Sequence, residues 1–202
     1  MVGALMLSGC VAPLTPQAPG ATQADRLVQV YPELKSGRFA VLADFEDAKH
    51  MDLFRVDSAS ESATVTLDPK GGRVETGKGG LALTVASAED ALVVGNADEA
   101  RWYLKRDWRA YDLLMLAVFA PREGLSLTLD VASGSAERRT SARTTLRLDK
   151  GWNVPRLDLA EIAELVALDD VQEMRLSIEG ATKGTAVRFD DIVLTSNRED
   201  VC

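Results

Sequence analysis

The feature that most constrains the fold of this chain is a period-two alternation of apolar and polar residues in short runs. In residues 125–131, leucines and a valine occupy every second position, and serine, threonine and aspartate stand between them. Residues 174–179 alternate in the same way. Because successive side chains of a β-strand point to opposite faces, each run predicts a strand with one face in the core and the other in water.

Runs of this kind recur from residue 39 onward and are separated by Gly, Asp, Asn and Pro, which is typical of β-sandwiches rather than of βαβ units. We expect strands near residues 39–45, 63–67, 81–86, 100–104, 113–119, 125–131, 141–148, 172–178 and 187–195. Helical spacing in residues 159–168 predicts a short helix, and a second one is expected within residues 25–35. The predicted fold class is all-β, a sandwich of two antiparallel sheets with one or two short helices.

The start of the chain resembles the signal of bacterial lipoproteins. The first nine residues are apolar or small and lead into Leu7-Ser8-Gly9-Cys10, which matches the lipoprotein pattern of Leu, two small residues and Cys. The resemblance implies cleavage before Cys10 and attachment of lipid chains to it, which would anchor the protein in a membrane. An apolar N-terminus that matches the pattern by chance is the alternative.

Three prolines at a spacing of three residues follow the cysteine and predict an extended linker. The predicted organisation is a signal segment at residues 1–9, the lipidated cysteine and linker at 10–36, one binding domain at 37–197 and a tail at 198–202. Lipidation would place this domain in the bacterial cell envelope, at the outer membrane, on its periplasmic or its surface face.

Charge and residue counts argue against several functions. The 23 Lys and Arg against 31 Asp and Glu give a net charge of −8, so we expect no nucleic-acid partner. Two cysteines and one histidine are too few for a Cys/His zinc site or a disulfide scaffold. His50 has no Ser or Cys nucleophile motif around it, and neither a Gly-x-Ser-x-Gly elbow nor a phosphate loop is present. We therefore expect a protein that is not an enzyme.

Four segments, in order, resemble galactose-binding-like jelly rolls. Residues 41–47 look like the opening strand and residues 187–194 like the closing strand. Between them, residues 77–85 resemble the glycine turn and third strand, and residues 108–114 the turn that feeds a central strand. Carbohydrate-binding modules and the complex I intermediate-associated proteins share this architecture. The resemblance implies a jelly roll, a fold that hosts sugar binding, protein binding and scaffolding alike.

The resemblance also implies a structural calcium ion between the first and last strands. By position in the motifs, Glu46 and Asp190 would be its carboxylate ligands, with Asp44 a possible third and carbonyl groups of the Lys78-Gly79 turn completing the shell. Such hard oxygen ligands are those that Ca²⁺ prefers. The alternative is that these carboxylates are solvated charges at strand ends.

Aromatic rings that could stack on sugars are scarce, because only 5% of the residues are aromatic. We expect most of them to pack in the core, namely Phe45, Trp108, Tyr111, Phe119, Trp152 and Phe189. Trp102 is then the candidate sugar platform.

The polar face of the predicted strands offers a second candidate site. Asp130, Arg147 and Arg175, together with Arg143 and Glu179, are expected on neighbouring strands. There, the arginine forks would pair with carboxylates or sulfates of an acidic ligand. The alternative is an ordinary solvated sheet face.

Three functions follow from these features. The favoured one is a lipid-anchored, non-catalytic module that binds a carbohydrate or an envelope polysaccharide. The second is a structural or assembly lipoprotein that uses the same sandwich to bind another envelope protein. The third is the binding portion of a larger secreted glycosidase.

Overall fold

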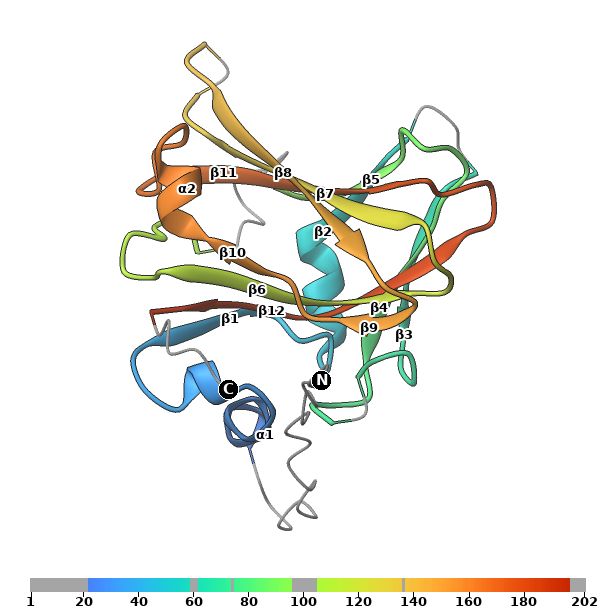
Figure 1. Cartoon of the computed structure of the whole chain (residues 1–202), viewed down its shortest axis with the longest axis horizontal. Coiled ribbons are helices and arrows are strands. Elements are labelled where there is room, and N and C mark those ends of the chain that lie inside the picture. Colours follow the sequence, from blue (N-terminus) through green and yellow to red (C-terminus); the bar gives the residue numbers. More distant parts are fainter. Residues whose placement is uncertain (1–21, 59–61, 74, 96–104, 136, 197–202) are drawn as a thin grey trace, which may run out of the picture.

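The computed structural model describes residues 22–58, 62–73, 75–95, 105–135 and 137–196. These residues form two antiparallel β-sheets that pack face to face, with two short α-helices (Figure 1). The predicted fold class is therefore confirmed.

The larger sheet, sheet A, has the last long strand of the chain near its centre. Its order is β10 (Arg156–Asp158), β6 (Leu113–Ala120), β12 (Ala186–Thr195), β4 (Gly80–Thr84) and β3 (Thr64–Asp68). In addition, β1 (Phe39–Ala43) pairs with β12, and β9 (Gly151–Asn153) pairs with β6. The first and last strands of the body therefore lie side by side.

The smaller sheet, sheet B, lies above sheet A in Figure 1. Its order is β2 (Phe54–Asp57), β5 (Ala91–Gly95), β11 (Val171–Glu179), β7 (Leu125–Ser133) and β8 (Thr140–Leu148). The two runs with the clearest alternation, β7 and β11, are neighbours in its centre and pair along most of their length. A 3₁₀ helix, η2 (Ala48–Leu53), leads into its edge strand β2.

The strands expected from the sequence do not include β2, β5, β9 or β10, and the expected strand at residues 100–104 lies outside the described residues. Strand β5 was not predicted because its sequence does not alternate between apolar and polar residues. Val93 faces outward, level with Arg55 and Arg175 on the flanking strands, yet it is only 1% exposed. Because long arginine stems cover apolar surface, an outward position of this sheet tolerates valine.

The inner faces of both sheets meet in one hydrophobic core. Trp108, Phe45 and Phe189 are buried in it as predicted, and Tyr111 packs against it. The prediction that Phe119 and Trp152 lie in this core is wrong. They stand opposite each other on β6 and β9, on the outer face of sheet A, and both are only partly buried. Since Val118 and Ala120 fill the core side of β6, the pleat turns the ring of Phe119 outward.

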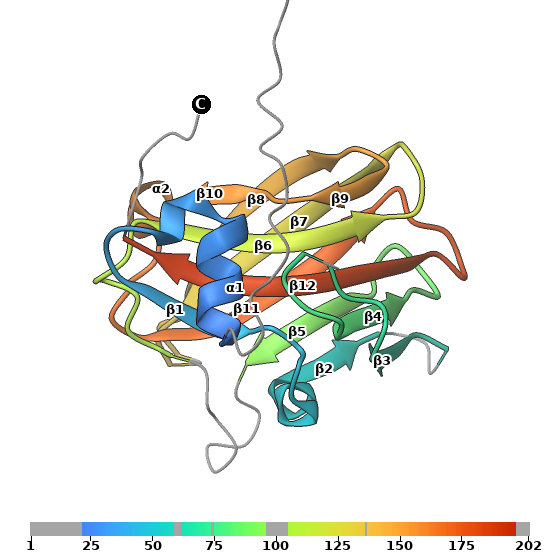
Figure 2. The same ribbon diagram turned by 90° about the horizontal axis from the view of Figure 1, so that it is seen from below.

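Helix α1 (Gln23–Val30) and the 3₁₀ helix η1 (Pro32–Leu34) cover part of the outer face of sheet A (Figure 2). Thr22 and Asp25 form a capping box at the start of α1. A second apolar cluster joins the helices to β6 and β12 and consists of Leu27, Tyr31, Leu34, Met115 and Val193. The helix predicted within residues 25–35 is thus confirmed, and the folded body extends into the segment that the predicted boundary at residue 36 assigned to the linker.

The second predicted helix is also present, as the shorter α2 (Leu159–Ala163). Asp158 caps it, and its Leu159 and Ile162 belong to the core. Within the described residues, neither helix is long and apolar enough to span a bilayer.

Candidate ligand-binding face

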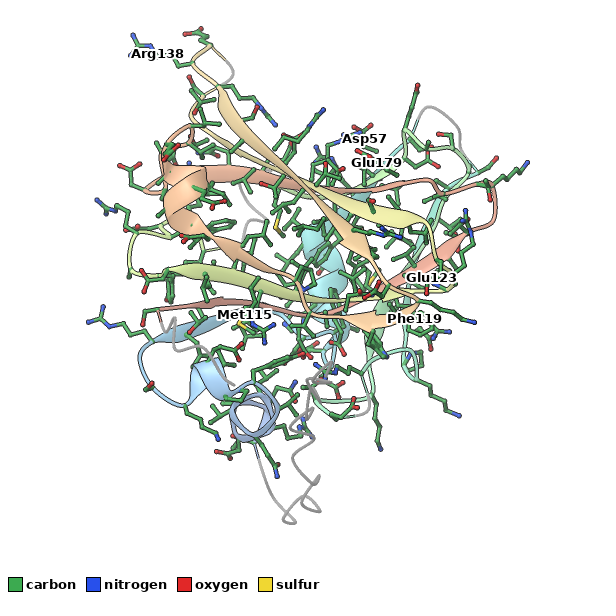
Figure 3. The ribbon with its side chains drawn as sticks, in the orientation of Figure 1. Asp57, Met115, Phe119, Glu123, Arg138 and Glu179 are labelled. Carbon is green, nitrogen blue, oxygen red and sulfur yellow. The ribbon has the colours of Figure 1, made fainter. Side chains whose placement is uncertain are left out.

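The outer face of sheet B is the open face of the sandwich. Figure 1 shows α1 against sheet A, whereas no helix of the described residues lies over sheet B. In Figure 3, Asp57 and Glu179 lie above sheet B, and Met115 and Phe119 lie on the opposite side of the molecule, below β6. No described helix therefore shields the exposed outward side chains of sheet B from a ligand.

Small side chains hollow out this face. Ala132 on β7 stands opposite Ser141 on β8 and opposite Glu173 on β11, which in turn stands opposite Gly95 on β5. A Cβ atom at Gly95 would lie 2.9 Å from Cγ of Glu173, so the glycine makes room for that side chain. The result is a pocket of about 400 Å³ lined by Asp130, Ala132, Arg139, Ser141, Arg143, Glu173 and Arg175.

Asp130 lies between two arginines. It stands opposite Arg143 on β8 and opposite Arg175 on β11. Arg143 donates to Oδ2 of Asp130 through Nε, at 2.9 Å, and through Nη2. This hydrogen bond, and the charge of Asp130, raise the pKa of Arg143. Arg175 instead donates through Nη1 to Asp57 on the edge strand β2 and through Nη2 to the carbonyl oxygen of Glu89.

Glu173, the second carboxylate of the pocket, is shared by two other arginines. Nη2 of Arg139 donates to its Oε1 at 2.6 Å, and Nη2 of Arg55 donates to its Oε2 at 3.3 Å. These contacts link the start of β8 to the edge strand β2 across the sheet. The pocket is therefore bounded by arginine–carboxylate pairs whose geometry is set by the strand register.

A second polar group lies on the same face beyond the pocket. Oγ1 of Thr128 donates to Oε1 of Glu179 at 2.7 Å and lies 2.9 Å from Oγ1 of Thr145. Arg147 stands opposite Ser126 on β7 and is exposed. It has no hydrogen bond or ion pair to any residue that the structure describes.

The structure thus brings the polar residues predicted as ligand-binding onto one face. Asp130 and Arg175 line the pocket, and Arg147 lies on the same face outside it. Trp102 lies outside the described residues, as does Cys10. Sequence reasoning missed Arg139, Glu173 and Ser141. The alternation of Arg139, Ser141 and Arg143 in the sequence is a signal that would have found two of them.

The pocket's charge differs from that of the whole chain. Three arginines and two carboxylates line it, which leaves one net positive charge, whereas the chain carries −8. Guanidinium groups offer paired donors, and carboxylates offer paired acceptors, so both bind polar ligands in fixed orientations. None of the seven lining residues is aromatic. Within the described part of the chain, this pocket can recognise a ligand by hydrogen bonds and charge but not by stacking.

Two of the predicted calcium ligands have other partners. Oδ1 of Asp44 lies 3.0 Å from Nδ1 of His50, and its hydrogen bond raises the pKa of that histidine. Oε1 of Glu46 accepts from the backbone N–H groups of Lys78 and Gly79, both at 2.6 Å. The carbonyl group of Lys78 accepts from Gly72, so it points away from Glu46.

The third predicted ligand, Asp190, belongs to a buried carboxylate pair on β12. Asp190 and Asp191 are 1% and 2% exposed. Burial and the charge of Asp191 raise the pKa of Asp190 to about 8, and burial raises the pKa of Asp191. Asp190 accepts from the backbone N–H of Arg73, and Oδ2 of Asp191 accepts from the hydroxyl groups of Tyr31 and Thr76. Oδ1 of Asp191 has no partner among the described residues.

These residues fit calcium in chemistry but are not gathered as its ligands. Within the described residues, no three Asp, Glu, His or Cys side chains cluster as a metal site requires. Beside Asp190, the carboxylate of Asp191 nevertheless has a buried oxygen without a partner among the described residues, which a hard cation could coordinate.

Comparison with known proteins reveals the fold but no family. No family model matches the sequence, and no curated protein is a significant match. Among solved structures, the chain is similar to the family 11 carbohydrate-binding module of a cellulosomal cellulase of Clostridium thermocellum, with 13% identity, a TM-score of 0.57 and coverage of 80% of this chain and 96% of that one.

Two further modules from the same organism agree. The family 30 module of another cellulosomal cellulase has 13% identity, a TM-score of 0.53 and coverage of 73% of this chain and 93% of that one. A xylanase with a family 22 module, complexed with xylohexaose, has 15% identity, a TM-score of 0.55 and coverage of 83% of this chain and 30% of that one. The chain therefore has the jelly-roll fold of these carbohydrate-binding modules.

Proposed function

We propose that this protein is a non-catalytic carbohydrate-binding module whose glycan lies on the outer face of sheet B. The observation that carries the proposal is the 400 Å³ pocket on the one sheet face that no described helix covers. Neighbours of the same fold support it, because one is a family 11 module solved in complex with a mixed-linked β-1,3-1,4 tetrasaccharide, at 14% identity and a TM-score of 0.56 over 82% of this chain and 100% of that one.

The pocket's side chains suit the hydroxyl groups of sugars. Arg143 and Arg175 stand on either side of Asp130, and Ser141 adds a hydroxyl group from the neighbouring row. The guanidinium groups donate hydrogen bonds and the carboxylates accept them, each through more than one atom, so together they would fix the orientation of a saccharide. Because the arginine–carboxylate pairs are already in place, little side-chain ordering remains to be done when the ligand binds.

We also propose that lipid chains on Cys10 anchor this module in the bacterial cell envelope. The lipoprotein pattern at residues 7–10 supports the anchor. The position of α1 adds an orientation, since the linker leads into this helix, which packs on sheet A, opposite the face with the pocket. In this arrangement the anchor is attached on one side of the sandwich and the glycan binds on the other.

A calcium ion at the buried carboxylates of β12 is a further part of the proposal. Asp190 and Asp191 would bind it through their carboxylate oxygens, among them the unpartnered Oδ1 of Asp191, and backbone carbonyl groups and water would complete the shell, because no third acidic side chain clusters with them among the described residues. The ion would stabilise the contact between β12 and the loops packed on it. Thermal melting in calcium and in EGTA tests this part by itself. Equal melting temperatures in the two buffers would contradict the calcium site and would not affect the proposed glycan site.

The alternative of a protein-binding lipoprotein gains no support from the described surface. A protein partner would favour a contiguous apolar patch. The large hydrophobic residues exposed in the described part of the chain are Val41, on β1, and Leu165, after α2. Single exposed residues of this kind are ordinary on any protein surface.

A glycan array with the chain from residue 22 onward tests the proposal, followed by isothermal titration of the best hit. We expect the double variant Arg143→Ala/Arg175→Ala to fold and to lose binding by a factor of about 100, since each arginine would contribute charge-assisted hydrogen bonds. Arg109→Ala is the matched control, because Arg109 pairs with Asp107 and neither residue lines the pocket. Silence across the array, or full binding by the double variant, would contradict the proposal.

A further inference from the structure

We infer that the glycan bound on sheet B is anionic, a polysaccharide whose carboxylate or sulfate groups are held by the arginines of the pocket. The inference rests on the proposed function and deepens it. The pocket has a net positive charge, whereas the whole chain has a net charge of −8. An overall acidic protein that gathers arginines on the outer face of sheet B concentrates there the charge that attracts anions.

The pocket also has more donors than its own acceptors use. A guanidinium group carries about five N–H donors. To residues that the structure describes, Arg139 donates one hydrogen bond, and Arg143 and Arg175 donate two each. Most of their donors are therefore left for a ligand rich in acceptors, and carboxylate and sulfate groups are the strongest acceptors that a polysaccharide offers.

These arginines are accessible to such a ligand. The side chains of Arg143, Arg139 and Arg175 are 70%, 48% and 31% exposed, although each already pairs with a carboxylate. The carboxylates hold the guanidinium planes in place from one edge, and the exposed edge remains free. An acidic group of the ligand therefore meets a preformed site and has no need to displace Asp130 or Glu173.

A second cation on the same face extends the site along β8. Arg147 is four residues from Arg143 on the same strand face, about 13 Å away. Arg147 has no hydrogen bond or ion pair within the described residues, so its charge is available. Two positive positions separated along a strand suit a polymer with repeated negative charges better than a single small acid.

The described lining of the pocket offers no aromatic ring of the kind that favours a neutral sugar. Neutral pyranose rings gain much of their binding from stacking on aromatic side chains. Among the described residues that line the pocket, none is aromatic, and the paired rings of Phe119 and Trp152 lie on the opposite face of the sandwich. For the described lining, the affinity therefore comes from charge and hydrogen bonding, and both favour an acidic polysaccharide.

Matched pairs of polysaccharides that differ only in charge test this inference. The pairs are polygalacturonate with its methyl ester, and dextran sulfate with dextran, so that carboxylates and sulfates are probed separately. We expect the charged member of at least one pair to bind at least ten times more tightly than its neutral partner, and the difference to shrink between 50 mM and about 300 mM salt. Arg143→Ala and Arg147→Ala should each weaken that binding, whereas Arg109→Ala should not.

The outcomes separate the inference from the proposed function. Equal binding of charged and neutral partners, or an array that yields only neutral glycans, overturns the anionic ligand and leaves a carbohydrate-binding module. Silence towards every glycan overturns both. Equally tight binding of double-stranded DNA of the same charge density would show a general polyanion site, and it would also overturn the assignment to a polysaccharide.

Discussion

The two outer faces of the sandwich show how one pleated fold can use its outward positions in opposite ways. On sheet A an apolar group of outward side chains lies beneath α1, which covers Met115 and Val193. The uncovered part holds Phe119 and Trp152, with the guanidinium group of Arg188 5.3 Å from the ring centre of Phe119. On sheet B the outward positions carry arginines and carboxylates around a pocket.

The comparison separates two features that are often expected together at a sugar site. The partly exposed rings lie on the face that carries the helix, and none of the described residues that line the pocket on the other face is aromatic. A search for aromatic platforms alone would therefore select sheet A. We assign stabilisation of the fold to the outer face of sheet A and ligand binding to the outer face of sheet B. The following experiments test whether the two faces have these separate roles.

The largest expected effect is on the helix-covered face. Leu27 is fully buried between α1 and sheet A, so Leu27→Ala should destabilise the protein by about 2–5 kcal/mol. Urea unfolding measures this change, with Leu165→Ala, at a residue that is 62% exposed, as the control. A Leu27 variant as stable as the control would show that α1 is not part of the folded body.

A pH effect of similar size should come from the buried carboxylates of β12. Burial raises the pKa of Asp190 in the folded state to about 8, so the folded protein binds more protons than the unfolded chain above about pH 4. In EGTA, stability should therefore fall as the pH rises from 5 to 8.5, by about 3 kcal/mol or roughly 10 °C in Tm.

Asp190→Asn isolates this contribution. The hydrogen bond between Asp44 and His50 raises the pKa of His50, so this histidine also stabilises the fold less as the pH rises. The pH dependence of wild-type stability therefore does not identify Asp190 by itself. In calorimetric melts the variant should show a smaller slope, which comes from His50 and from Asp191, whose pKa burial also raises. An unchanged slope in Asp190→Asn would mean that this carboxylate ionises normally in the folded protein.

A smaller effect is expected on the open face. Removing the side chain of Arg143 deletes hydrogen bonds to a ligand but no core contact, because this side chain is 70% exposed. Arg143→Ala should weaken glycan binding by about tenfold and change the free energy of unfolding by less than about 1 kcal/mol. Titration calorimetry and urea unfolding of the same preparation check both values. A loss of stability without a loss of affinity would show that Arg143 has a structural role and not a role in binding.

The smallest effect tests the rings. Trp152→Ala removes the larger ring from the outer face of sheet A, and our account predicts glycan affinity within about twofold of wild type. The same titration measures it. If this variant lost binding while Arg143→Ala retained it, the two faces would have to exchange roles.

Much of the fold follows from the sequence because strand periodicity acts locally. The alternation in β7 and β11 predicts both strands and the face of every side chain, so Asp130 and Arg175 could be placed on one polar face. Their position directly opposite each other depends on strand order and register, which are set by packing over the whole sheet.

Other features depend on contacts that no local pattern reveals. Phe119 is apolar yet faces outward, because Trp152 and Arg188 cover it from neighbouring strands. Asp191 has a φ of 46° at an irregularity of β12, and its carboxylate accepts from Tyr31, which is 160 residues away. The acidic motif of the sequence indicated a cluster there, but only the folded chain shows that Tyr31, the residue directly after α1, contributes to it.

The central claim is that the ligand lies on sheet B, and amide chemical-shift mapping with the best glycan of the array tests it most directly. Our account predicts that the shifts which change on titration gather on β7, β8 and β11, around Asp130, Ser141 and Glu173. Changes that gather instead on β6, β9 and β12, around Phe119 and Trp152, would contradict it.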